Sequence, residues 1–81
     1  MNLRQLEYFV KVAETLNYTK AAGQLYVSQS AVTKQIRLLE EELEAELFER
    51  NHKSVKLTMA GELFYQDALD ILSNIERSRN K

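Results

Sequence analysis

Residues 18–37 read YTKAAGQLYVSQSAVTKQIR, and this stretch decides both the fold class and the candidate function. It contains two short helical patterns separated by a break at Tyr26 and Val27. Its second half is rich in amides, hydroxyls and cations, and no carboxylate occurs between Asn17 and Leu39, although the chain has 12 acidic residues. A surface of amide and guanidinium donors without negative charge suits a polyanion with base edges that can be recognised. The stretch therefore favours double-stranded DNA as the partner.

Capping residues and apolar spacing predict three helices up to residue 43. Asn2 with Gln5 three residues later predicts a capping box at the start of the first helix. Thr19 can cap the second helix, and Ser28 the third. In the third helix, residues 28–43, the apolar positions recur at spacings of 4, 3 and 4, so its polar residues fall mostly on the opposite side. The apolar positions are Val32, Ile36, Leu39 and Leu43.

The remainder predicts a hairpin and one long helix. Two β-compatible runs, 47–50 and 55–57, flank the polar, basic segment 51–54, as in a two-stranded hairpin. Thr58 can cap a final helix of some twenty residues, a rod of roughly 30 Å. That length exceeds what so small a domain needs, and the apolar spacing is close to that of a coiled coil, so we expect a second chain to pack there. The candidate dimer interface consists of Phe64, Ala68, Ile71 and Ile75.

Composition bears on which other classes of protein and of site the chain can belong to. Eighty-one residues make one small domain, and the absence of cysteine excludes disulfides and thiolate metal sites, as expected of a cytoplasmic protein. No apolar run approaches a membrane span, and no signal-peptide core is present. His52 is the single histidine, without a cysteine or a suitable acid as partner, so we expect no enzyme activity, metal or cofactor. The predicted class is all-α with a small β-hairpin.

The net charge of -1 is unusual for a DNA-binding chain, but the charges are unevenly distributed. Residues 17–39 contain Lys20, Lys34 and Arg37 and no acid, and residues 50–61 contain three further cations and no acid. The rest of the chain is strongly acidic. Two cationic segments on an acidic body are consistent with one docking surface and a repelled opposite side. The run of glutamates over residues 40–46 is interpreted as a solvated helix end that points away from any phosphate.

Helix, tight turn, helix and hairpin form the pattern of a winged helix-turn-helix, whose second helix enters the major groove of DNA. The wing reaches the adjacent backbone or the minor groove. Gln29 can form a bidentate pair with adenine, and Lys34 or Arg37 can donate to guanine. We assign base contacts to Gln29, Ser30, Thr33 and Lys34, and backbone or wing contacts to Ser28, Arg37 and Lys53.

Three blocks of the chain resemble the N-terminal domain of LysR-type transcriptional regulators. They are AAGQLYVSQSAVTKQIRLLEEEL at residues 21–43, LFER at 47–50 and VKLTMAG at 55–61. The likeness covers nearly the whole chain. It implies a winged helix-turn-helix over residues 1–58 of a bacterial regulator and a linker helix over 59–81 that joins a homodimer. It also implies operator contacts by Gln29, residue 30, Thr33, Lys34 and a basic wing residue, and a small-molecule effector only on a further domain.

The chain departs from the pattern of these regulators at four positions. Ser30 stands where proline is frequent, so an apolar contact becomes a hydrogen bond. Lys34 and Lys53 replace arginines and lack the planar fork of that side chain. Glu44 stands where glycine usually ends the third helix, so that end is expected to lack its left-handed cap.

Two other classes remain open. The domain can be a winged-helix module that binds protein and has no DNA affinity, which the net charge favours. It can also serve chiefly as a dimerisation element through its last helix.

Overall fold

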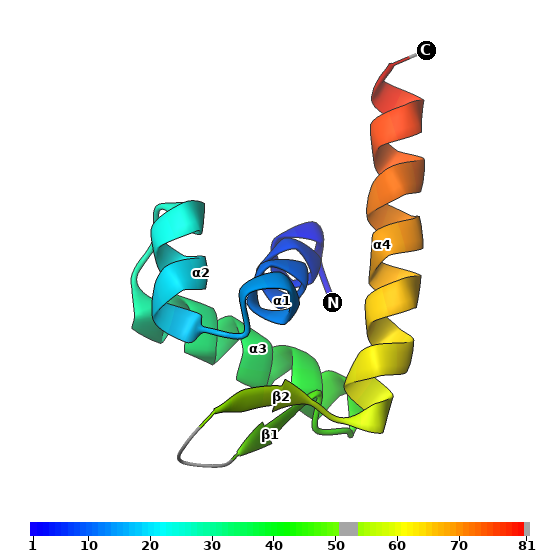
Figure 1. The fold of residues 1–81 in the computed structure, drawn as a ribbon. Helices are drawn as coiled ribbons and strands as arrows, with labels where there is room; N and C mark the ends of the chain where they lie inside the picture. The colour runs from blue at the N-terminus through cyan, green and yellow to red at the C-terminus, as the bar shows by residue number, and fades with distance from the viewer. Residues whose placement is uncertain (51–53, 81) are drawn as a thin grey trace.

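The computed structural model describes residues 1–50 and 54–80, which form four helices and a two-stranded antiparallel hairpin (Figure 1). The elements are α1 (Leu3–Thr15), α2 (Tyr18–Leu25), α3 (Gln29–Leu43), β1 (Phe48–Arg50), β2 (Val55–Leu57) and α4 (Met59–Arg79). In Figure 1, α1 lies between α2 and α4, α3 passes below it, and α4 extends upward as a rod. The predicted fold class is confirmed. Residues 51–53, which include His52 and Lys53, lie outside the described residues.

Three of the predicted helix caps are confirmed. Asn2 Oδ1 accepts a hydrogen bond from the backbone N–H of Gln5 at 2.8 Å, and Gln5 Oε1 accepts one from the N–H of Asn2 at 3.2 Å. This reciprocal pair is the capping box expected from the sequence. Ser28 caps α3, and Thr58 caps α4, each by accepting a hydrogen bond from an N–H in the first turn. These caps place the starts of α1, α3 and α4 where the side chains predict them.

The prediction that Thr19 caps the second helix is wrong. Asn17 is the cap: its Oδ1 accepts from the backbone N–H of Lys20 at 2.9 Å, and its own backbone is extended. Thr19 is the second residue of α2 and lies inside the helix. Asn ranks above Thr at this position because its side chain reaches the N–H groups of the first turn more readily. The Thr19 hydroxyl is therefore left for another partner.

Three helices end in a left-handed residue that is not glycine. Leu16, Tyr26 and Glu44 have φ values of 51°, 60° and 54°. The expectation that Glu44 leaves α3 without a left-handed cap is wrong, because the following Ala45 donates to Glu40 O at 3.1 Å and closes the helix end. A Cβ in this conformation costs on the order of 1–2 kcal/mol per residue, so packing elsewhere must hold these turns.

Phe9 of α1 is the centre of the hydrophobic core. Its side chain is fully buried, and its ring centroid lies 5.5 Å from that of Phe48 in β1 and 5.1 Å from that of Phe64 in α4. The ring of Tyr18, at the start of α2, packs against Phe48 from the other side, with centroids 6.0 Å apart. These rings therefore join α1, α2, the hairpin and α4 around one point.

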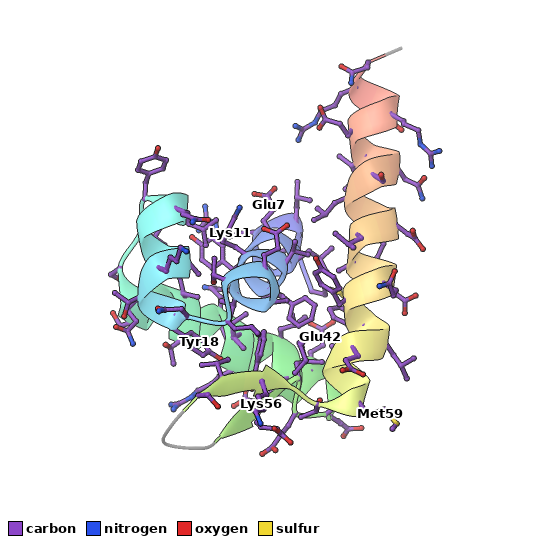
Figure 2. All side chains as sticks on the ribbon, viewed as in Figure 1. Glu7, Lys11, Tyr18, Glu42, Lys56 and Met59 are labelled. Atoms are coloured by element: carbon purple, nitrogen blue, oxygen red, sulfur yellow. The ribbon has the colours of Figure 1, made fainter. Side chains whose placement is uncertain are left out.

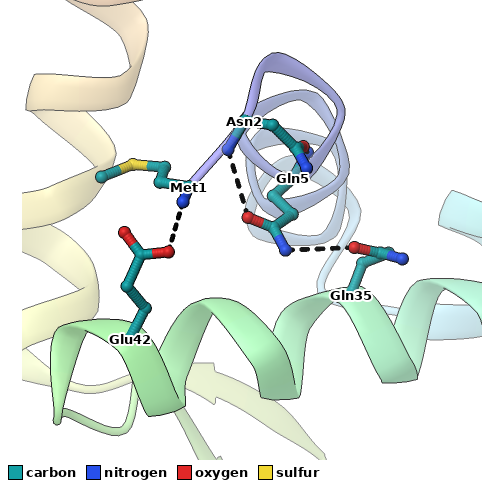
Figure 3. Close-up of polar contacts among 5 residues, drawn as sticks. All are labelled: Met1, Asn2, Gln5, Gln35 and Glu42. Atoms are coloured by element: carbon teal, nitrogen blue, oxygen red, sulfur yellow. Dashed lines mark hydrogen bonds and ion pairs between the residues drawn. The ribbon is translucent and has the colours of Figure 1, made fainter.

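Polar contacts join the N-terminus and α1 to α3 (Figure 3). Gln5 Nε2 donates to Gln35 Oε1 at 3.1 Å, so the capping-box side chain also contacts α3. The α-amino group of Met1 forms an ion pair with Glu42 near the end of α3. Gln5 is buried although polar, and its hydrogen bonds offset the cost of removing its amide from water.

Glu40 ties the end of α3 to the first strand. It is 8% exposed, and its Oε2 accepts hydrogen bonds from the backbone N–H groups of Leu47 at 2.7 Å and Phe48 at 3.4 Å. The interpretation of the glutamate run as a solvated helix end is therefore wrong for this residue. A carboxylate that accepts from two backbone donors fixes the direction in which the chain leaves α3.

The start of α4 approaches the chain before β1 very closely. Thr58 donates from its backbone N–H to Leu47 O at 3.0 Å and from its hydroxyl to Glu46 O. A Cβ built on Gly61 meets Leu47 O at 2.1 Å and Leu57 Cδ2 at 2.9 Å, so only glycine fits there.

None of the helices in the described ranges is long and apolar enough to span a membrane.

Gly61→Ala is expected to destabilise the domain by about 1–3 kcal/mol, because its methyl group collides with a backbone carbonyl that cannot rotate away. The melting temperature should fall by roughly 4–8 °C per kcal/mol, measured by circular dichroism. Gly23→Ala is the matched control. Its Cβ meets nothing within 4 Å in the middle of α2, so the higher helix propensity of alanine should raise stability slightly. Equal melting temperatures for the two variants would contradict the close approach.

Candidate nucleic-acid interface

An open groove of about 860 Å³ runs along the exposed side of α3. Its lining includes all six side chains from α3 and its cap that the sequence assigned to DNA. They are Ser28, Gln29, Ser30, Thr33, Lys34 and Arg37. We call these six residues the recognition surface. Lys53, the wing residue of the same assignment, lies outside the described residues.

The recognition surface is exposed because the opposite side of α3 fills the core. Val32, Ile36 and Leu39 are fully buried, as their spacing predicts. The polar side chains are exposed, except for Thr33, which is partly buried. A helix that buries one stripe and presents polar groups over two turns has the dimensions of a major-groove element, since the groove is about 12 Å wide.

The cations of the recognition surface have no acidic partner among the described residues. Over residues 1–50 and 54–80, the ion pairs join the Met1 α-amino group to Glu42 and Lys11 to Glu14, the latter at 3.2 Å. Lys34 and Arg37 belong to neither pair and are exposed. Figure 2 places Lys11 on α1, well away from Lys56 on the hairpin. Cations without a partner can neutralise phosphates without first breaking an internal ion pair.

Short polar contacts hold the start of α3. Ser28 Oγ accepts from the backbone N–H of Ala31 at 3.1 Å and lies 3.2 Å from Ser30 Oγ. Thr19 Oγ1 of α2 donates to Gln29 Oε1 at 3.0 Å. Three side chains of the recognition surface thus have defined positions in the free protein.

Two groove residues are missing from the sequence assignment. Leu38, 42% exposed, and Glu41 line the same groove as Lys34 and Arg37. Helical spacing could have identified both residues. Leu38 follows Lys34 by four residues and Glu41 follows Arg37 by four, so each lies on the same side of the helix as its cation. Glu41 is exposed, as expected of a solvated helix end, and the expectation that the glutamate run points away from any phosphate stays a prediction. Glu41 brings a carboxylate to the edge of the recognition surface.

The predicted dimer residues on α4 are divided between two environments. Ala68 is fully buried and Phe64 packs on Phe9, so both contribute to the core of the protomer itself. Ile71 is 39% exposed and Ile75 is partly exposed. The largest exposed apolar side chains of α4 are ones that the sequence did not assign to an interface. They are Met59, 79% exposed, and Leu63, 68% exposed.

Comparison with known proteins matches residues 3–62 to the family described as bacterial regulatory helix-turn-helix protein, lysR family. The probable cat1 operon transcriptional activator of Acinetobacter lwoffii is 47% identical over 77 residues, 95% of this chain and 25% of that protein. The regulator TfdT of Cupriavidus pinatubonensis is 43% identical over 81 residues, all of this chain and 36% of that protein. The chain thus spans only a minor part of the length of these relatives.

Solved structures are similar over the same range. The complex of BenM_DBD with catB site 1 DNA matches with a TM-score of 0.95 and 45% identity, covering 99% of this chain and 90% of that one. The CbnR_DBD–DNA complex matches with a TM-score of 0.94 and 45% identity, covering 99% and 92%. The family match covers residues 3–62, sequence identity and backbone geometry extend over 95% or more of the chain, and the chain belongs to the LysR family of bacterial regulatory helix-turn-helix proteins.

Proposed function

We propose that this chain binds double-stranded DNA in a sequence-specific manner as part of a LysR-type transcriptional regulator in the bacterial cytoplasm. The observation that carries the proposal is the recognition surface: six polar or cationic side chains along one groove, of which the two cations form no ion pair within residues 1–50 and 54–80. The similarity to two domains solved in complex with DNA supports it. The role is that of a DNA-binding module and not of an enzyme.

The proposed docking places α3 in the major groove. Gln29, Ser30, Thr33 and Lys34 contact base edges, while Ser28 and Arg37 contact phosphates. The hairpin follows α3 directly and is held to it by Glu40, so it lies next to the same stretch of duplex. Lys53, which lies between the two strands in the sequence, contacts the adjacent backbone or minor groove in this proposal. Residues 1–58 form the DNA-binding unit in this arrangement.

Residues 59–81 join two copies of the chain in our proposal. The exposed apolar side chains Met59, Leu63 and Ile71 leave α4 with a surface that a second α4 can cover. A twofold dimer presents its two α3 helices to successive major grooves, so operators should contain twofold-related half-sites roughly 34–36 Å apart. An effector-binding domain, if it follows as the length of the relatives suggests, lies beyond residue 81.

A protein-interaction module without DNA affinity is the second candidate, and the net charge of -1 favours it. The two functions differ in their dependence on salt. For a DNA-binding protein, each phosphate contact lowers log K by about 0.9 for each unit of log salt concentration. No affinity for a random duplex pool at low salt would support the interaction module instead.

Arg37→Gln should weaken binding to all duplexes and reduce the salt slope by about 0.9, because one phosphate contact is lost. Fluorescence anisotropy at several salt concentrations measures both quantities. Lys11→Gln is the control, since Lys11 has the same charge but is paired with Glu14 on α1. A similar slope change in both variants would contradict the placement of the recognition surface.

Glu41→Gln should strengthen binding to all duplexes by about two- to fivefold at low salt, because it removes a carboxylate from the edge of the groove. The gain should shrink as salt increases. Glu7→Gln removes the same charge from an exposed position on α1 and should change affinity little (Figure 2). Unchanged affinity in the Glu41 variant would place that end of α3 away from the duplex.

Ile71→Asp should convert the dimer into monomers, since it places an unpaired carboxylate in the proposed α4 interface. Sedimentation equilibrium measures the change directly. Gln24→Asp adds the same charge at an exposed position of α2, on the other side of α1 from α4, and should leave the dimer intact. Persistence of the dimer in the Ile71 variant would mean that the two chains associate through a different surface.

A further inference from the structure

The hydrogen bond between Thr19 and Gln29 joins α2 to the first residue of α3. The Thr19 hydroxyl donates to Gln29 Oε1 at 3.0 Å, and both residues are exposed. Thr19 does not cap its own helix, because Asn17 does so. The hydroxyl therefore serves a partner ten residues away in the sequence, at the entrance of the recognition surface.

Both ends of this hydrogen bond stand on fixed backbone. Asn17 caps α2 two residues before Thr19, and Ser28 caps α3 immediately before Gln29. The turn between the helices is set by the left-handed Tyr26, whose backbone N–H donates to Gly23 O at 3.3 Å. With both first turns held in this way, the hydrogen bond restricts the Gln29 side chain itself and not a mobile segment.

We propose that Thr19 is a positioning residue that orients the Gln29 carboxamide for recognition of adenine. The proposal rests on the DNA-binding function proposed above. The carbonyl oxygen of Gln29 has two lone pairs, and Thr19 engages one of them. The second lone pair and the NH₂ group remain, and together they form an acceptor and a donor side by side.

This remaining pair matches one base in the major groove. Adenine presents the N6 amino donor beside the N7 acceptor, whereas guanine presents the two acceptors N7 and O6. A carboxamide that is free to rotate can turn its NH₂ group toward guanine, but one held by its oxygen keeps the acceptor beside the donor. Ordering the side chain before DNA arrives also removes part of the entropy cost of binding.

The test compares the unaltered chain with four variants on duplexes that the unaltered chain selects from a random pool. Gln29→Ala first identifies the base pair whose preference depends on Gln29. Thr19→Val, which keeps the shape but lacks the hydroxyl, should then lower the preference for adenine over guanine at that pair by about three- to tenfold. Thr19→Ser, which keeps the hydroxyl, should restore the preference. In the Gln29→Ala background, Thr19→Val should have no further effect.

Other results would overturn the inference in distinguishable ways. Thr19→Val could lower the affinity for every duplex equally in both backgrounds and also lower the salt slope. Thr19 would then contact a phosphate, so the positioning role would fail while the DNA-binding function would stand. The positioning role is also refuted if the unaltered chain prefers a base other than adenine at the pair that Gln29→Ala identifies. It is refuted as well if Gln29→Ala changes the base preference at no position. If the unaltered chain selects no duplex, the proposed function itself fails. Thermal unfolding of each variant verifies that the fold is retained.

Discussion

The backbone of one residue, Leu47, connects the helix that carries the recognition surface to the start of the last helix. Its N–H donates to the buried carboxylate of Glu40 on α3, and its C=O accepts from Thr58 at the start of α4. The helix that carries the recognition surface and the helix proposed to join two chains are thus bound to opposite sides of one residue. Gly61 packs against the same carbonyl and leaves no space for a side chain. The relative placement of α3 and α4 depends on this connection more than on any contact between the helices themselves.

Much of the architecture follows from local sequence. Asn2, Ser28 and Thr58 start their helices as capping chemistry predicts, and the stripe of Val32, Ile36 and Leu39 is buried as its period requires. The same stripe placed the six residues of the recognition surface on one groove, because a helix with one buried side has only one exposed side. The hairpin was expected from the β-compatible runs 47–50 and 55–57, and the resemblance to LysR-type regulators supported the same wing and the same linker helix.

The errors arise where tertiary contacts decide between local alternatives. Thr19 and Asn17 are both acceptable caps, and the choice between them freed a hydroxyl that only the folded chain brings to Gln29. Glu40 looks like a solvated glutamate until the chain after α3 folds back and offers it two backbone donors. Glu44 adopts a left-handed conformation because the helix end is closed by backbone hydrogen bonds whatever the side chain. Phe64 and Ala68 have the spacing of an interface but fill the core of the protomer.

The junction at Gly61 also sets a mechanical limit. The helix α4 has 21 residues and spans about 30 Å, so a tilt of roughly 10° at its base displaces its far end by about 5 Å. A displacement of this size corresponds to one to two base-pair steps along a duplex, at roughly 3.4 Å per step. The tight packing of Gly61 against the Leu47 carbonyl opposes such a tilt of α4. In the proposed dimer, the angular tolerance at Gly61 would therefore limit how far apart along a duplex the two copies place their contacts.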